Sequence, residues 1–158
     1  MSGIHEVVCT LCKGAITTQC RRGNCRLDLS NVAERLTIVD ADKHLPVTQE
    51  GEKKPDFFVF LVRSRSIAVV VEMKDGKGKA EHADQVQAGA DHLASLLSDI
   101  SPLELVPLLL HQSFNPTERK ALNRRNIRFR GASHPVWSHR CGADLAKVLE
   151  LALLRSTR

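Results

Sequence analysis

The sequence predicts a mixed α/β fold, in which a central sheet is flanked by helices. Two wholly apolar runs, at residues 57–62 and 67–71, have the length of buried strands and are separated by four polar residues. Apolar residues recur at helical spacing over 83–97 and again over 142–154. The chain has 158 residues and is 42% hydrophobic, which suits one ordinary domain with a buried core.

The first half of the chain predicts helix, strand, strand and helix, in that order. The first helix is expected at 29–36, where apolar residues recur at helical spacing behind a possible N-cap at Asp28 or Ser30. A polar loop at 48–54 leads into the two apolar strands. A glycine-rich basic turn at 74–79 then leads into the next helix.

The second half predicts strand, short helix, strand and helix. A strand is expected at 105–111, with Pro107 near its start because proline is excluded from mid-strand positions. Pro116 suits the first turn of a short helix. Residues 127–130 alternate apolar and basic side chains, as in a strand with one buried face, and the helix at 142–154 closes the chain.

Polar residues mark one end of the predicted strand pair. Asp56 opens the first apolar run, and Glu72 and Lys74 follow the second. A four-residue turn places Asp56 beside Met73, whereas a turn one residue shorter or longer places it opposite Glu72 or Lys74. Two carboxylates that converge at the edge of an apolar sheet require a protonated acid, a neighbouring cation or a bound divalent metal such as Mg²⁺. Lys74, which shares a strand face with Glu72, supplies one positive charge.

Pro55-Asp56, followed sixteen residues after Asp56 by Glu72-Met73-Lys74, resembles the signature of the PD-(D/E)XK nuclease superfamily. This superfamily includes restriction endonucleases, Holliday-junction resolvases and RecB-type exonucleases. The likeness covers roughly residues 29–112 and implies an αβββαβ core. It implies a nuclease, expected to be an endonuclease, that hydrolyses phosphodiester bonds in DNA with Mg²⁺ or Mn²⁺.

The same resemblance implies roles for individual residues. Asp56 and Glu72 would bind the metal with help from the Met73 carbonyl, and Lys74 would position or activate the attacking water. Nucleases of this size often act as dimers, so the resemblance also implies a homodimer.

The resemblance adds one candidate from each neighbouring helix. Gln85 is the best match for a site glutamine on the helix that follows the strands, with Gln87 on the other flank of that helix. Glu34 is the candidate on the leading helix, although it projects about 140° from the apolar stripe of that helix. The alternative to an enzyme is a non-catalytic nucleic-acid-binding or adaptor module that retains the fold and carries only a solvated strand-end ion pair.

Four of the five cysteines lie close together near the N-terminus: Cys9, Cys12, Cys20 and Cys25. Two close pairs separated by a short loop are typical of a tetrahedral structural Zn²⁺ site, and a segment with so few apolar residues needs such a metal to fold. Redox-active thiols and disulfides are the alternatives. Cys141 is isolated in sequence and is expected to be an ordinary thiol. We therefore expect a zinc-binding extension at 1–26 and a nuclease-like domain at 27–158.

Positive charge is concentrated in one segment. The chain carries a formal net charge of +5, and residues 115–140 contain seven basic side chains against one acidic side chain. Four arginines surround the strand predicted there: Arg124, Arg125, Arg128 and Arg130. If this strand borders the carboxylates, the arginines would hold nucleic-acid phosphates. The alternative is a solvated strand edge whose charge prevents aggregation.

Composition also argues against some classes of protein. No apolar run approaches the roughly 18 residues of a membrane span, and the N-terminal residues lack the pattern of a signal peptide, so we expect an intracellular, cytoplasmic protein without a membrane partner. With no tyrosine and one tryptophan, the chain is poorly suited to recognise bases by aromatic stacking.

Overall fold

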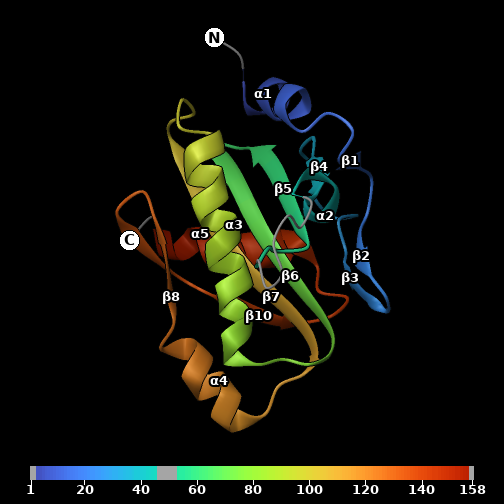
Figure 1. Cartoon of the computed structure of the whole chain (residues 1–158), viewed down its shortest axis with the longest axis vertical. Coiled ribbons are helices and arrows are strands. Elements are labelled where there is room, and N and C mark those ends of the chain that lie inside the picture. The colour runs from blue at the N-terminus through green and yellow to red at the C-terminus, as the bar shows by residue number, and fades with distance from the viewer. Residues whose placement is uncertain (1–2, 46–52, 157–158) are drawn as a thin grey trace.

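The computed structural model describes residues 3–45 and 53–156 and contains a central mixed sheet. Within these residues the sheet has six strands in the order β1-β4-β5-β6-β7-β10 (Figure 1). The first four strands pair antiparallel, whereas β6–β7 and β7–β10 are parallel. The strands are β1 (Ile16–Thr17), β4 (Thr37–Asp40), β5 (Phe57–Val62), β6 (Ser66–Lys77), β7 (Leu103–Ser113) and β10 (Trp137–Arg140).

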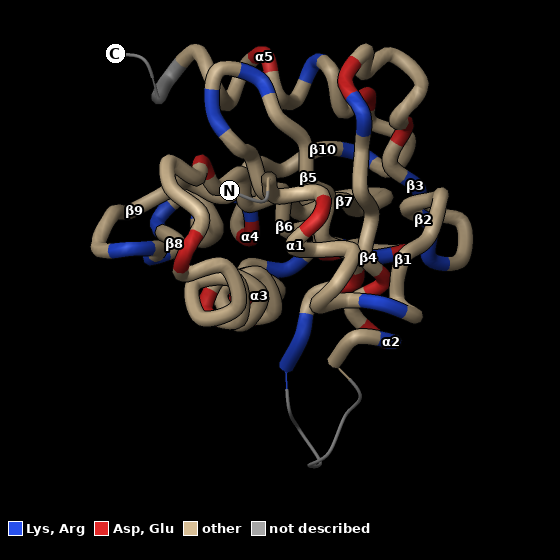
Figure 2. Tube along the Cα trace, turned by 90° about the horizontal axis from the view of Figure 1, so that it is seen from above, with Lys and Arg blue, Asp and Glu red and all other residues tan. Residues whose placement is uncertain are grey.

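Helices cover both faces of this sheet, which confirms the predicted fold class. Helices α3 and α5 lie on opposite sides of β5, β6 and β7 (Figures 1 and 2). The helices are α1 (Ile4–Leu11), α2 (Ala41–His44), α3 (Ala83–Leu96), α4 (Pro116–Asn123) and α5 (Leu145–Ser156), with a 3₁₀ turn, η1, at Ala80–His82. No helix in the described ranges is long and apolar enough to cross a membrane.

Two small antiparallel pairs lie outside the central sheet. The first joins β2 (Cys20–Arg22) to β3 (Cys25–Leu27), and the second joins β8 (Asn126–Phe129) to β9 (Ala132–Pro135). The predicted domain boundary at residue 26 lies within β3.

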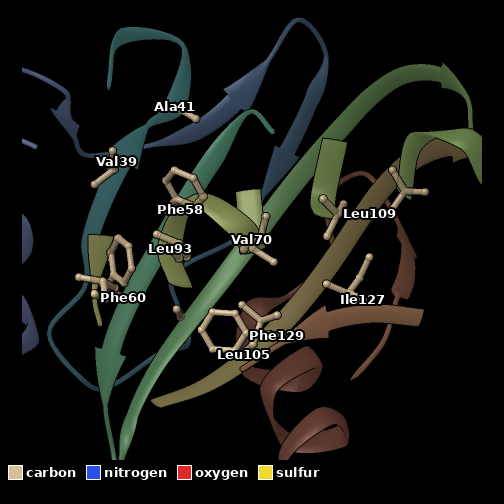
Figure 3. Close-up of a cluster of buried hydrophobic side chains, with 14 of the residues drawn as sticks. Val39, Ala41, Phe58, Phe60, Val70, Leu93, Leu105, Leu109, Ile127 and Phe129 are labelled. Atoms are coloured by element: carbon tan, nitrogen blue, oxygen red, sulfur yellow. The ribbon is translucent and has the colours of Figure 1, made fainter. Parts of the chain in front are cut away.

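A hydrophobic core fills the space between the sheet and α3. Phe58, Phe60 and Val70 project from β5 and β6 and pack with Leu93 of α3 (Figure 3). Helix α1 adds Ile4 and Val8, while α4 and β8 add further side chains, among them Leu122, Ile127 and Phe129. The N-terminal helix, which sequence patterning did not predict, is therefore part of this core.

A second core lies on the other face of the sheet, beneath α5. Phe57, Val59 and Leu61 alternate with the residues of the first core along β5 and pack with Leu145 and Leu149 of α5. The β2–β3 pair belongs to this core. Because both faces of β5 and β6 are buried, their sequences are apolar without interruption.

The turn between β5 and β6 determines which residues face each other at the far end of the pair. Val62 pairs with Ser66, so the turn has three residues, which is the shortest of the alternatives that the sequence allows. The pairing continues to Phe57 and Val71. Asp56, whose N–H donates to the Val71 carbonyl at 2.9 Å, therefore comes opposite Glu72.

The helix predicted at 29–36 does not form. The Asp28 carboxylate accepts hydrogen bonds from both the N–H and the hydroxyl of Ser30, which holds the chain in a turn. Leu29, Val32 and Leu36 pack as partly buried residues against the second core. Their helical spacing was a misleading signal, because a turn and loop bury the same side chains.

Pro107 is also placed differently from the prediction. It lies in the middle of β7 and pairs with Val70 of β6. Pairing with β10 begins only at Leu108, so β7 has an open edge beside Pro107. Proline is tolerated at such an edge because no neighbouring strand there requires a hydrogen bond from its backbone nitrogen.

Candidate active site

Asp56, Glu72 and Lys74 converge where β5 begins. The Met73 N–H donates to Asp56 Oδ2 at 2.7 Å, which fixes the carboxylate beside β6. Glu72 lies opposite Asp56, and Lys74 Nζ is 3.4 Å from Glu72 Oε2. The predicted convergence is thus present, with the geometry of the shorter turn.

Glu72 is the most deeply buried acid of this group. Only 3% of its surface is exposed. Burial raises the pKa of Glu72 to about 9, and a hydrogen bond and charge repulsion from Asp56 act in the same direction, whereas Lys74 opposes them. The raised pKa favours a protonated Glu72, which would relieve the repulsion between the two carboxylates.

Arg22 enters the site from β2, and sequence reasoning did not assign it there. Its Nε lies 3.2 Å from Asp56 Oδ1, and its Nη2 lies 2.7 Å from Asp40 Oδ1 at the end of β4. The guanidinium carbon sits 4.3 Å from the centre of the Phe57 ring. An open groove lined by Arg21, Arg22 and Asp40, among others, borders this cluster.

A hydrogen bond and a disulfide hold the β2–β3 pair, which carries Arg22, next to the site. The Asn24 N–H donates to Asp75 Oδ2 at 3.0 Å, one residue after Lys74. A disulfide joins Cys25 to Cys141, and the Cys141 sulfur lies 3.6 Å from the Lys74 carbonyl oxygen. The position of Arg22 thus depends on contacts between residues far apart in the chain, which local patterns do not reveal.

The cysteines do not form the predicted four-thiolate zinc site. Cys12 belongs to the core on the α3 side of the sheet, whereas Cys20 and Cys25 belong to the core on the α5 side. Cys25 is bonded to Cys141, which is therefore not the ordinary thiol expected, and Cys9, Cys12 and Cys20 are free. Across the described ranges, no group of three or more His, Cys, Asp and Glu side chains is arranged to hold a metal ion.

Glu34 lies far from the carboxylates. Its Oε1 accepts from Arg63 Nη2 at 3.1 Å, in the turn at the opposite end of β5 from Asp56. The six residues of β5 separate the two ends by about 20 Å. The assignment of Glu34 to the site was wrong because the helix that would have carried it does not form.

Gln85 lies on α3 and has an unused acceptor. Its Oε1 is buried and has no hydrogen-bond partner among the residues described. One turn later, a Cβ at Gly89 would lie 2.7 Å from Pro55 Cγ and from Val70 Cγ1, so this face of α3 packs directly on the residue before Asp56. Gln87 instead anchors β8, because it donates to the Arg128 carbonyl and accepts from the Arg128 N–H, each at 2.9 Å.

The four predicted DNA-binding arginines differ in their surroundings. Arg125 forms an ion pair with Asp84 in the first turn of α3. Arg130 follows β8 and donates from Nη1 to the Ile100 carbonyl at 2.7 Å, just beyond the C-terminus of α3. All four are exposed, but the side chains of Arg124 and Arg128 form no ion pair or hydrogen bond with the described residues. Strand β8 therefore runs along α3, with Arg125 at the end nearer Gln85.

The chain matches no protein-family model, no curated protein sequence and no solved structure. A functional assignment therefore rests on the chemistry of the residues themselves.

Proposed function

We propose that this protein is a Mg²⁺-dependent nuclease of the PD-(D/E)XK type that hydrolyses phosphodiester bonds in DNA. One observation carries the proposal: Asp56, Glu72 and Lys74 meet at the end of a buried strand pair, with a Lys74–Glu72 distance of 3.4 Å. Two carboxylates and a lysine at this place in a sheet are the groups that metal-assisted hydrolysis of a phosphodiester uses.

The order of the elements supports the same proposal. The sequence α1, β4, β5, β6, α3, β7 reads as αβββαβ once four smaller features are set aside: β1 and the β2–β3 pair before β4, the short α2 between β4 and β5, and η1 before α3. Helix α1 takes the place that the resemblance gave to residues 29–36. The three antiparallel strands then bring the acidic residues to one end of the sheet, beside the first turn of α3.

The donor atoms suit a hard divalent cation. Asp56, Glu72 and the Met73 carbonyl would supply oxygen ligands, which Mg²⁺ prefers. A bound cation would offset the repulsion between Asp56 and Glu72, since burial and the neighbouring Asp56 raise the pKa of Glu72 and disfavour its charged form. When bound, Mg²⁺ would supply an acidified water and positive charge beside the phosphoryl oxygens.

The protein's own residues would prepare the site for this chemistry. Asp56 is already oriented by the Met73 N–H, and Glu72 must release its proton before it can act as a ligand. Lys74, about one-third exposed, would position the attacking water and balance charge near the phosphate. Gln85 would add a neutral acceptor from α3, and the exposed Arg124 and Arg128 would hold neighbouring phosphates.

A second candidate is a DNA-binding or adaptor module that has kept the fold without the activity. The ion pair between Arg22 and Asp56, at 3.2 Å, favours this candidate because a permanent guanidinium would take the place of the metal. In the nuclease, Arg22 must release Asp56 and keep its shorter bond to Asp40.

The experiment is an assay of the wild-type chain on plasmid, single-stranded and branched DNA, with Mg²⁺, Mn²⁺ or EDTA. The nuclease cleaves at least one of these DNAs, and EDTA stops the cleavage. No cleavage of any of them with either metal would contradict the proposal.

Calorimetry separates the two candidates. Heat of Mg²⁺ or Mn²⁺ binding that disappears with Glu72→Ala supports the nuclease. DNA binding that needs no metal and weakens steeply with salt, without any such heat, supports the module.

A further inference from the structure

A second cluster of metal-ligating side chains lies on the α3 side of the sheet, apart from the carboxylates. Cys12 Sγ is 3.8 Å from His44 Nε2, and His44 Nε2 is 2.9 Å from His92 Nε2. Nothing in the proposed nuclease chemistry uses these three residues. They come from parts of the chain that are 32 and 48 residues apart.

Each side chain is held in place by its own element. Cys12 caps the C-terminus of α1 and is 1% exposed, and His44 is the last residue of α2. His92 projects from the middle of α3 and stacks on Phe58 of the core, with the ring centres 6.1 Å apart. His44 therefore contacts a ligand atom from each of two other elements, Cys12 of α1 and His92 of α3.

The spacing of the ligand atoms suits a tetrahedral zinc ion. With Zn–N distances of about 2.0–2.1 Å and a Zn–S distance of about 2.3 Å, neighbouring ligands lie about 3.4 Å apart for two nitrogens and about 3.6 Å apart for nitrogen and sulfur. The two observed distances, 2.9 and 3.8 Å, are within about 0.5 Å of these values. Two neutral imidazoles can meet through their Nε2 atoms when one Nε2 donates its proton and the other accepts it. The accepting Nε2 therefore has its lone pair directed toward the other ring.

Cys9 is the candidate for the fourth ligand. It lies in the last turn of α1, three residues before Cys12, and residues at this spacing share a helix face with Cβ atoms about 5–6 Å apart. Cys-X₂-Cys is also the spacing with which zinc sites take two thiolates from one segment. Cys9 is half-buried rather than exposed.

We propose that Cys9, Cys12, His44 and His92 bind a structural Zn²⁺ ion that ties α1 and α2 to α3. Among the described residues these side chains are not yet gathered around one point, so binding would require the Cys12 and His92 side chains to move closer together around His44. Two thiolates and two neutral imidazoles cancel the charge of Zn²⁺. A neutral centre suits a site with a buried cysteine, where an unpaired charge is costly.

The proposal changes the ligand set that sequence spacing suggested. The first cysteine pair is kept, but Cys20 and Cys25, on the other side of the sheet, are replaced by two histidines. His44 and His92 carry no spacing signal, because they lie 48 residues apart and meet only in the folded chain.

The first test is the metal content and the cobalt spectrum of the full-length wild-type chain, purified without chelator and reloaded with Zn²⁺ or Co²⁺. We expect one zinc per chain and a tetrahedral Co²⁺ spectrum whose sulfur-to-metal band corresponds to two thiolates. A chain that takes up no zinc, or a Co²⁺ band that corresponds to four thiolates, would overturn the proposal.

Single variants identify the ligands. Cys12→Ser and His92→Gln should lose the zinc. Their zinc affinity should fall by more than the roughly 10- to 100-fold that follows loss of a residue that only hydrogen-bonds to a ligand. Cys20→Ala is the matched control, since Cys20 is a free, buried cysteine on the opposite face of the sheet, and it should keep one zinc. Loss of zinc from Cys20→Ala but not from His92→Gln would refute the site. If a ligand variant does not fold, the number of thiolates in the Co²⁺ spectrum of the wild type decides whether the proposed ligand set is correct.

Discussion

Glu72 is a buried acid whose protonation depends on the residues around it. Its surroundings raise its pKa from 4.5 to about 9, with burial as the largest cause and Asp56 as the next. A carboxyl group with a raised pKa stabilises the fold at acidic pH, and this contribution is lost as the pH rises toward the folded-state value. The metal-free protein should therefore become less stable between pH 5 and pH 9.

Glu72→Gln tests this dependence, because glutamine mimics the protonated acid at every pH. In EDTA, the free energy of unfolding of the wild type should fall relative to that of Glu72→Gln by up to about 1.4 kcal/mol per pH unit. Urea unfolding at several pH values measures both proteins. The histidines, whose pKa values are also shifted, are common to both and cancel in the difference. Parallel pH profiles would show that Glu72 is not protonated in the fold.

At the residue scale, the convergence of side chains could be predicted where local geometry was sufficient. Asp56, Glu72 and Lys74 were found because strand alternation and a short turn restrict where residues at the end of a strand pair can lie. The place of Arg22 in the site could not be predicted, because its ion pair with Asp56 depends on the separate β2–β3 pair and on the hydrogen bond from Asn24 to Asp75. Glu34 was misplaced because its helix was inferred from spacing alone.

At the scale of elements, the disulfide between Cys25 and Cys141 joins β3 to the loop before α5. It spans 116 residues, and a cross-link of that length lowers the entropy of the unfolded chain by the equivalent of about 4–5 kcal/mol. Cys141→Ala should therefore lower the free energy of unfolding by about 2–5 kcal/mol, and Cys20→Ala by less. Denaturant unfolding of the two variants under non-reducing conditions gives the comparison.

Thiol titration checks the same pairing independently. The chain has five cysteines, of which three are free in the structure. In metal-free denaturant, three thiols should react before reduction and five after it. Reaction of all five without a reductant would rule out the disulfide.

Prediction of the elements depended on the length of each apolar run as well as on its burial. Strand β4 was missed although its first three residues are buried, because four residues are too few for a pattern. Strands β5 and β6 were predicted because burial on both faces makes their sequences continuously apolar. The two-residue strand β1 and the partly exposed β10 were missed, because neither has enough apolar residues for a pattern. Residues 29–36 show the opposite error, in which a loop buries apolar side chains at helical spacing.

At the scale of the whole molecule, the exposed arginines near β8 differ in whether their side chains bind the protein. Arg130 donates to carbonyls at the C-terminus of α3, whereas the Arg128 side chain forms no hydrogen bond or ion pair with the described residues. Arg130→Ala should lower the free energy of unfolding by about 1 kcal/mol, because it removes charged hydrogen bonds to main-chain acceptors. Thermal unfolding measures this change.

Arg128→Ala should act on DNA binding instead. Its stability should be unchanged, while the slope of log affinity against log salt concentration should become less steep by about 1, as for the loss of one phosphate contact. Fluorescence anisotropy over a range of salt concentrations measures the slope. An unchanged slope for Arg128→Ala would place the DNA on another surface.

The whole molecule places an acidic pair, a lysine and a buried amide acceptor at one end of a sheet with two well-filled faces. The fold class and the convergence of the carboxylates could be inferred from the sequence. The disulfide, Arg22 and the Cys–His cluster required the three-dimensional packing, because each joins segments that are distant in the chain.

The most direct test of the proposed site is the rate of DNA cleavage by Lys74→Ala in Mg²⁺, with Lys77→Ala as the control. Lys77 lies on the same strand and is exposed, so it matches the change in charge without touching Glu72. We expect Lys74→Ala to cleave at least about 100-fold more slowly than the wild type, the lower range for loss of a proton-transfer group, and Lys77→Ala to cleave at nearly the wild-type rate. Equal cleavage by wild type and Lys74→Ala would contradict the nuclease assignment.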